Sequence, residues 1–456
     1  MGEALRILRY NTGTDKKAFV QFKQDFDAVI FNATIVAYSG SSVADLVAMH
    51  KRKYIIDPQT HIFQQDISAI TVKNKKDNEI KKSVSKYLDQ LPEALSNITR
   101  KERRPLSSEE IGTQLDKLVE SVYAFQTKYV KVYIEEKDYD KYLKFVKLVP
   151  EPRLIIAPYF MLKDCYTNLE LDKWLAINKK CIQKAIQINQ TSKSQISSIA
   201  AQLVLDKAVL VSDNFCKKIK AAYNEDNYEY IFIWIDDFNS FDTKSEYMKA
   251  FADLIATLNA IGKKPIMAYG GYESIILCNE KSPYRLYGVA QSVGYGEYRN
   301  ITPVGGGMPT NKYYFYPLHQ RMKFNAGADI LTVHGYFNKK KNPLEHATDY
   351  YKAICDCRQC HKVIGDKIDK FDKYNDSTSF EVHTRNGVIS RNRPTTDAEL
   401  IAAFHFLYCK VNEWKNADEE DFKTLITKLK NNYKLYQSNQ LRQIAEWCEI
   451  YGHKEN

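Results

Sequence analysis

Residues 230–271 decide the fold, and they read YIFIWIDDFNSFDTKSEYMKAFADLIATLNAIGKKPIMAYGG. An apolar run opens the stretch, an amphipathic helical pattern follows, and a second apolar run closes it. Near-continuous apolar runs are typical of strands covered on both faces, as in parallel sheets. Thr243 and Glu246 stand at capping-box spacing and Gly262 follows the helical pattern, so the stretch predicts a helix between two parallel strands.

The same strand-then-helix unit recurs along the chain. The further runs predicted to be strands are VIFNATIV (29–36), YIIDP (54–58), LIIAPYF (154–160), AVLVSD (208–213), GVAQSVGYGE (288–297) and ADILTVHG (328–335), with KYYFYPL (312–318) as a ninth candidate. Repeated units of this kind favour an α/β fold, a TIM-type (β/α)8 barrel. A doubly wound open sheet is the alternative.

Shifts in composition divide the chain. Residues 73–147 are charged, helical in pattern and poor in β-branched runs, which predicts a helical insertion on a barrel formed by residues 1–335. We expect a small zinc-binding subdomain at 336–414, for the reason given below, and a Lys-rich helical tail at 415–456.

Composition places the chain among globular proteins. Of its 456 residues, 44% are hydrophobic and 27% are charged, and no apolar run approaches the ~20 residues that span a bilayer. The N-terminus resembles no secretory signal, and the nine cysteines are an odd number, scattered along the chain. We therefore expect a cytoplasmic protein without a disulfide framework or a membrane partner.

The net charge of +10 is concentrated in blocks. The basic blocks are Lys73, Lys75 and Lys76; Arg100, Lys101, Arg103 and Arg104; Lys339, Lys340 and Lys341; and Arg391 and Arg393. Beside 32 tyrosines, such blocks suit a nucleic acid whose phosphates are neutralised and whose bases stack. A solvated, lysine-rich surface is the equally simple alternative.

Three cysteines form a compact motif, Cys355-x-Cys357-x-x-Cys360. Thiols at this spacing can converge on one tetrahedral ion, which predicts a zinc site. His405, in the amphipathic stretch LIAAFHFLYC, is the favoured fourth ligand. The alternatives are His361, His383 and Cys409. Three cysteines and a histidine would saturate the ion, so the predicted role is structural.

The cysteine motif, the later histidine on a helix and the preceding barrel resemble the tRNA-guanine transglycosylases and their DNA-modifying relatives. The resemblance implies a zinc-bearing barrel that exchanges guanine for a 7-deazaguanine in RNA or DNA. The interval from Cys360 to His405 is longer than the family's, which implies an insertion between them. The implied partners are a nucleic acid and a 7-deazaguanine-type base, with a homodimer or a partner subunit as a further possibility.

Two further stretches are similar to the family's motifs. YIIDPQTHIFQ (54–64) places Asp57 where the family has an acid/base aspartate, although the family's glycines are missing. GVAQSVGYGE implies that Gly296 and Glu297 line the base pocket. The simplest alignment of NAGADILTVHG puts Thr332 where the family has its nucleophile. Either the nucleophile lies elsewhere, or the chain is a non-catalytic nucleic-acid-binding subunit.

Base exchange needs a carboxylate that attacks the sugar and a second acid/base group. In a barrel these groups lie at the carboxyl ends of strands, where Asp57, Glu297 and the pair Asp236–Asp237 are expected. Because side chains alternate along a strand, one member of the pair faces the barrel mouth. We favour Asp237 as nucleophile, with Asp236 as the alternative.

Each of these assignments has a plain alternative. Asp57 precedes Pro58 and would serve as a turn residue, and Glu297 would pair with Arg299. Asp236 and Asp237 would hold a metal in an unrelated barrel hydrolase. Gly270 and Gly271 end the PIMAYGG run, where they would admit a ligand or make a turn.

Overall fold

The computed structural model describes residues 4–10, 13–50, 53–72, 79–137, 139–145, 151–192, 198–294, 297–301, 310–337, 343–384, 387–438 and 441–452. They form two compact units. The barrel unit comprises Met1–Asn11, Lys23–Ser274 and Pro283–Val304, and the second unit comprises Thr12–Phe22, Ile275–Ser282 and Gly305–Asn456. The division into three domains at residues 335 and 414 stays a prediction.

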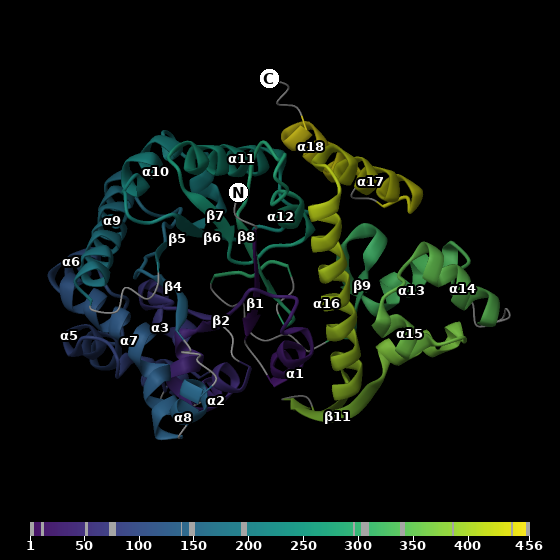
Figure 1. Ribbon diagram of the computed structural model, residues 1–456, viewed down its shortest axis with the longest axis horizontal. Helices are drawn as coiled ribbons and strands as arrows, with labels where there is room; N and C mark the ends of the chain where they lie inside the picture. The colour runs from purple at the N-terminus through teal and green to yellow at the C-terminus, as the bar shows by residue number, and fades with distance from the viewer. Residues whose placement is uncertain are drawn as a thin grey trace. The chain divides into compact units, whose positions relative to one another are not determined.

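Eight parallel strands close into a barrel in chain order (Figure 1). They are β1 (Leu5–Tyr10), β2 (Ala28–Asn32), β3 (Tyr54–Asp57), β4 (Pro152–Ile156), β5 (Ser198–Asp206), β6 (Tyr230–Asp236), β7 (Lys264–Met267) and β8 (Gly288–Ser292). The ring is closed by pairing of β1 with β8. The TIM-type barrel is therefore confirmed, and the open-sheet alternative is wrong.

Helices follow the strands of the barrel unit. They are α2 (Ala33–His50), α3 (Ile67–Ile70), α4 (Lys82–Leu88), α5 (Glu93–Asn97), α6 (Ser108–Thr113), α7 (Leu115–Glu136), α8 (Tyr139–Phe145), α9 (Asn168–Thr191), α10 (Phe215–Tyr223) and α11 (Ser245–Ala260), with short turns η1 (Thr60–Gln64), η2 (Ile98–Glu102) and η3 (Lys207–Val211). The described residues between β3 and β4 are mostly helical, as their charged sequence predicted.

The second unit is mainly helical. Its helices and turns are α1 (Gly13–Phe22), α13 (Phe324–Val333), α14 (Pro343–Ala353), α15 (Arg358–Ile364), α16 (Thr396–Glu419), α17 (Phe422–Leu435), α18 (Leu441–Gly452), η4 (Tyr316–Leu318) and η5 (Ile368–Asn375). Two antiparallel pairs complete it, β9 (Lys312–Phe315) with β10 (Gln320–Lys323) and β11 (Ser377–Thr384) with β12 (Gly387–Pro394). The long helix α16 packs against α15, β9 and η5. Residues of α12 (Tyr272–Ile276) belong to both units.

Alternate residues of the strands fill the barrel. The buried side chains that share this core include Leu5, Ile7, Ala28, Ile30, Ile55, Leu154, Ile156, Ala200, Val204, Phe232, Trp234, Ile266, Ala268 and Ala290. Because side chains alternate with a period of two, the same faces of the strands carry Arg9, Asn32, Asp57, Gln202 and Asp236 inward. The inner face thus turns polar at the carboxyl ends of several strands.

Three sequence-based assignments were wrong, and a fourth, KYYFYPL, forms a strand but not one of the barrel. ADILTVHG lies in helix α13, where the buried Phe324, Ala328 and Leu331 recur at helical spacing. KYYFYPL forms β9, outside the barrel, and AVLVSD follows β5 instead of forming it. Helix α11 begins at Ser245 after Lys244, so the cap expected from Thr243 is not used.

One barrel strand was missed altogether. β1 reads LRILRY, in which Arg6 and Arg9 interrupt the apolar run. The strand tolerates Arg9 inside the barrel because a carboxylate reaches it there. Among the described residues, no helix is long and apolar enough to cross a membrane.

Candidate active site and metal site

A buried ion pair lies at the carboxyl ends of the first barrel strands. Arg9 Nη1 lies 3.0 Å from Asp57 Oδ2, and both side chains are wholly buried. Arg9 also donates hydrogen bonds to Asn32 Oδ1 (3.1 Å) and, through Nε, to the carbonyl oxygen of Ala268 (3.3 Å). The guanidinium therefore ties together β1, β2, β3 and the end of β7.

Two further donors reach Asp57. The hydroxyl of Tyr159 donates to Oδ1 at 2.6 Å, and the backbone N–H of Gln59 donates to the same oxygen at 3.2 Å. Burial raises the pKa of Tyr159 well above its usual value, and the Asp57 carboxylate raises it further, so the hydroxyl keeps its proton. Asp57 is thus a fully buried carboxylate held by three donors inside the barrel, and its bond from the Gln59 N–H also gives it the turn role considered from the sequence.

His61, on η1, lies against this group. Its ring stacks on Tyr159 at 5.3 Å between centroids and meets the Trp234 ring edge-on at 5.2 Å. The side chain is 1% exposed, and neither ring nitrogen has a hydrogen-bond partner among the described residues. Burial lowers the pKa of His61 to about 4, against the opposing effect of Asp57. The imidazole is therefore neutral at pH 7 and has a donor and an acceptor available.

An aromatic layer connects the ion pair to β6. The rings of Trp234 and Tyr269 lie 4.8 Å apart, and the Arg9 guanidinium carbon lies 4.2 Å from the Tyr269 ring centre. Arg299 donates to the Tyr269 hydroxyl at 2.9 Å, while its carbonyl accepts from Trp234 Nε1 at 2.8 Å. Flat rings and cations thus surround the carboxyl end of the barrel core.

The two aspartates after Trp234 point in different directions. Asp236 is half-buried on the inward face of β6, and Oδ1 accepts a hydrogen bond from the backbone N–H of Ile301. Burial raises the pKa of Asp236, while that hydrogen bond opposes the rise. Asp237 has a left-handed φ of 48°, its side chain is 61% exposed, and it is ion-paired with Lys207. Of the pair, Asp236 faces the barrel.

Asp206 adds a second carboxyl beside Asp236. The two residues are register partners at the ends of β5 and β6. Burial raises the pKa of Asp206 to about 6, against a backbone hydrogen bond from Asp164, and the nearby Asp164 and Asp236 carboxylates contribute to the rise. With a pKa of about 6, the Asp206 carboxyl is partly protonated just below neutral pH.

Three of the predicted base-binding residues border one small pocket. Its lining residues are Phe238, Asn239, Ser240, Phe241, Met267, Tyr269, Gly270, Gly271, Glu273, Ser274 and Glu297. A Cβ at Gly270 would lie 2.6 Å from Val289 Cγ1, and one at Gly271 would lie 3.2 Å from Glu297 Cβ. Both positions therefore favour glycine for reasons of space. Gly296 lies outside the described residues.

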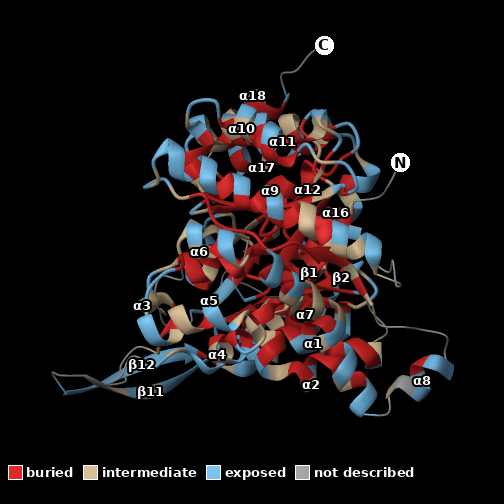
Figure 2. Ribbon diagram, turned by 90° about the vertical axis from the view of Figure 1, so that its left-hand side faces the viewer, coloured by how far each residue is buried: buried red, intermediate tan, exposed pale blue. Residues whose placement is uncertain are grey.

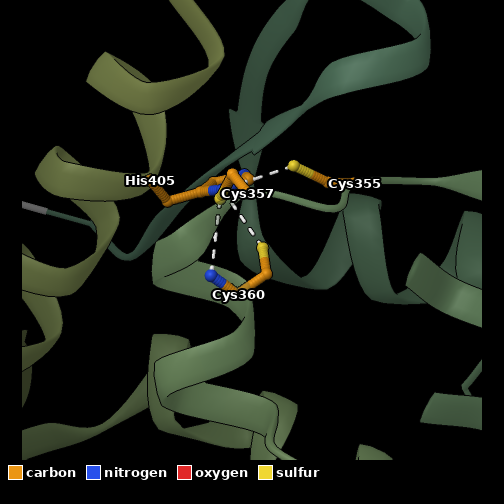
Figure 3. A group of neighbouring side chains, drawn as sticks. All are labelled: Cys355, Cys357, Cys360 and His405. Atoms are coloured by element: carbon orange, nitrogen blue, oxygen red, sulfur yellow. Dashed lines mark hydrogen bonds between the residues drawn. The ribbon is translucent and has the colours of Figure 1, made fainter. Parts of the chain in front are cut away.

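The four predicted metal ligands converge in the second unit (Figure 3). The ligand atoms of Cys355, Cys357, Cys360 and His405 all lie within 4.8 Å of one another, and all four residues are buried. Sγ of Cys357 and Sγ of Cys360 each lie 3.3 Å from His405 Nδ1. Such a cluster could hold a metal ion.

Neighbouring groups fix the orientation and the tautomer of the His405 ring. Its Nε2 lies 2.8 Å from the carbonyl oxygen of Tyr314, which can only accept, so Nε2 carries the proton. The lone pair of Nδ1 then faces the three sulfurs, as in metal sites whose histidine is oriented by a second hydrogen bond. The Tyr313 ring stacks on the imidazole at 4.8 Å and closes the site on that side.

The alternative ligands occupy other positions. His361 is exposed. Its Nε2 lies 2.5 Å from Asp356 Oδ1, and its ring stacks on Tyr351. The side chain of His383 lies outside the described residues. Sγ of Cys409, one helical turn after His405, lies 3.7 Å from His405 Nδ1 and borders the cluster as a fifth polar group.

No protein-family model matches this chain, and no curated protein matches it. The closed parallel barrel and the Cys₃His cluster therefore carry the functional interpretation.

Several residues of the barrel mouth were missed in the sequence. They are Arg9, Asn32, His61, Tyr159 and Arg299. Arg9 and Asn32 each stand at the last inward position of a strand, so strand parity would have identified them once the strands were known. His61 carries no such signal, since its burial depends on the fold around η1.

Proposed function

We propose that this chain is a transglycosylase that replaces guanine with a 7-deazaguanine-type base in a nucleic acid. The observation that carries the proposal is a pair of inward carboxylates, Asp57 on β3 and Asp236 on β6, in different surroundings. Asp57 is buried and held by three donors, whereas Asp236 is half-buried and has a raised pKa. Different surroundings are what two carboxyl groups need to take different roles in one reaction.

In the proposed reaction, an Asp236 oxygen bonds to the sugar C1′ while the bond from C1′ to N9 breaks. The bonding electrons leave with guanine, which takes up a proton from solvent, and the sugar stays attached to the carboxylate. The incoming base gives up a proton, attacks C1′ and releases Asp236. Asp57, with Tyr159 and Arg9 around it, is the base proposed to accept the proton of the incoming base, and it returns that proton to solvent.

The geometry favours Asp236 over Asp237 as nucleophile. Asp237 is exposed and neutralised by Lys207, so it would have to leave its ion pair and turn inward to react. The metal-hydrolase alternative has no support, because no metal-binding group of three or more ligands within the described residues includes either aspartate. The binding-subunit alternative rested on Thr332, which lies on α13 and not on a barrel strand.

The small pocket lined by Tyr269 is the proposed place for the base. Gly270 and Gly271 line it without side chains, Phe238 and Phe241 supply aromatic surface, and Glu297 offers an acceptor for the N–H groups of a purine.

Zinc is the ion that best fits the Cys₃His cluster, since three thiolates and one imidazole are a common tetrahedral zinc set. Such a site is saturated, so zinc would supply cross-linking and not bond chemistry. Cys360 lies on α15 and His405 on α16, so zinc would fasten these two helices to each other.

The test is incorporation of isotope-labelled guanine into DNA or RNA oligonucleotides without added divalent metal. We expect Asp236→Asn to abolish incorporation, Asp57→Asn to slow it, and the matched control Asp237→Asn to retain it. Loss with Asp237→Asn and retention with Asp236→Asn would refute the nucleophile assignment. Absence of incorporation by the wild type on both polymers would refute base exchange itself.

A further inference from the structure

The ribbon formed by β11 (Ser377–Thr384) and β12 (Gly387–Pro394) is not held in place by a hydrophobic core of its own. Its register runs from Ser377 paired with Pro394 to Thr384 paired with Gly387, which makes it ~26 Å long at ~3.3 Å per residue. Every residue from 387 to 393 is exposed, and Figure 2 shows the ribbon in pale blue along most of its length. An isolated two-stranded ribbon is marginally stable at best, so burial within the unit does not account for it.

The two faces of the ribbon differ in chemistry. One face, here called the arginine face, carries Thr378, Phe380, Val382, Ile389, Arg391 and Arg393. The opposite face carries Ser379, Asn392, Ser390 and Glu381, the one carboxylate among the described residues of the two strands, together with Val388, which is 52% exposed. On the arginine face, the Arg393 guanidinium carbon lies 5.6 Å from the Phe380 ring centre, and Ile389 is 36% exposed. That face therefore combines positive charge with uncovered apolar surface.

These arginines differ from the other basic blocks of the chain. Arg100 is paired with Asp89 at 2.6 Å, and Arg104 is paired with Glu102 and Glu110. No carboxylate pairs with Arg391 or Arg393 in the part of the chain that the structure describes. The blocks at 73–76 and 339–341 lie outside that part. The arginine face is thus a described basic surface whose charge is not neutralised within the protein.

We propose that the ribbon is an arm that inserts into the major groove of duplex DNA. The B-form major groove, ~12 Å wide, admits a two-stranded β-ribbon, whereas the major groove of A-form RNA is too deep and narrow for side chains to read. Arg391 and Arg393 would contact phosphates or guanine edges, and Ile389 and Val382 would contact sugars or thymine methyl groups. The inference deepens the proposed function by choosing DNA as the polymer, and it rests on that function for its role.

The metal cluster fixes the base of this arm. The ribbon falls between Cys360 and His405, and the backbone N–H of Thr395 donates to the carbonyl oxygen of Asp376 at 3.0 Å just below the first strand pair. One chain end of the arm continues into α16, which carries His405, and the other continues from η5, whose Tyr374 hydroxyl lies 3.7 Å from Cys360 Sγ. An arm anchored at both ends holds its orientation.

The test is fluorescence anisotropy with a labelled DNA duplex and an RNA duplex of the same sequence, over a range of salt concentrations. In the Arg391→Gln, Arg393→Gln variant, the slope of log K against log salt for DNA should become less steep by about 2, at ~0.9 per phosphate contact. The same counterion release predicts an about 30-fold loss of affinity at 0.15 M salt. The matched control is Lys415→Gln, Arg442→Gln, which removes two exposed charges of the same unit.

Equal weakening by both double variants, or an unchanged slope in the ribbon variant, would overturn the inference. So would RNA-duplex binding that depends on the arginines as strongly as DNA binding does. A variant in which residues 378–393 are replaced by Asn-Gly should reproduce the loss while keeping its metal content. If wild type shows this binding but no base exchange, the proposed function alone fails; if exchange persists and the ribbon variants bind normally, this inference alone fails.

Discussion

The imidazole of His61 should stay neutral down to about pH 4, far below the ordinary histidine pKa of 6.5. Burial is the main cause, and the cations Arg299, Lys163 and Arg9 add to it, while Asp57 acts in the opposite direction. A downward shift of this size corresponds to ~3 kcal/mol between the two protonation states. The side chain is 1% exposed, so solvent does little to reduce that difference.

The lowered pKa of His61 makes the stability of the folded protein depend on pH. Between pH 6.5 and about 4 the unfolded chain binds a proton at this histidine and the folded protein does not. The free energy of unfolding must therefore fall as the pH falls through this window, and the loss reaches ~3 kcal/mol below it. His61→Gln keeps a polar side chain of similar size but cannot titrate, so the variant should lack this component of the acid destabilisation.

NMR of protein labelled at its nine histidines measures the effect directly. The resonance that disappears in His61→Gln identifies His61. The chemical shift of that resonance should stay constant from pH 7.5 to 5. Denaturation of the barrel unit at several pH values, wild type against variant, supplies the free energies. A His61 midpoint at or above 6.5, or a stability difference that does not change with pH, would refute this reading of the site.

Three further predictions concern the metal, the ion pair and the pocket. Cys357→Ser should lower both the zinc content, expected at one per chain, and the melting temperature; wild type purified with far less than one zinc would contradict this. Arg9→Met should cost ~3–5 kcal/mol because it leaves Asp57 buried and unpaired, and adding Asp57→Asn should recover part of the loss if the pair is the cause. Gly270→Ala should impair both base binding and stability, measured by KM and melting temperature, because its Cβ would lie 2.6 Å from the buried Val289 Cγ1 and 2.7 Å from Ser274 Oγ at the pocket wall.

Local patterns in the sequence predicted more than distant ones. The cysteine motif spans six residues, and a histidine on an amphipathic helix was enough to suggest the fourth ligand. The barrel followed from its apolar runs. Strand β1 was not predicted because its two arginines are typical of a surface segment. Arg9 is buried only because Asp57, 48 residues away, pairs with it. Helix α13 was misread because a short apolar run fits both strand and helix.

The metal cluster also bears on how freely the DNA arm could vary. The ligands Cys360 and His405 are 45 residues apart, so an ion held by both closes that stretch into a loop. The entropy of closing a loop grows only slowly with length, by ~0.6 kcal/mol for each doubling. Extra or fewer strand residues at the tip would therefore cost the cluster little. An ion bound there would separate the part that must keep its geometry from the part that can change length and sequence.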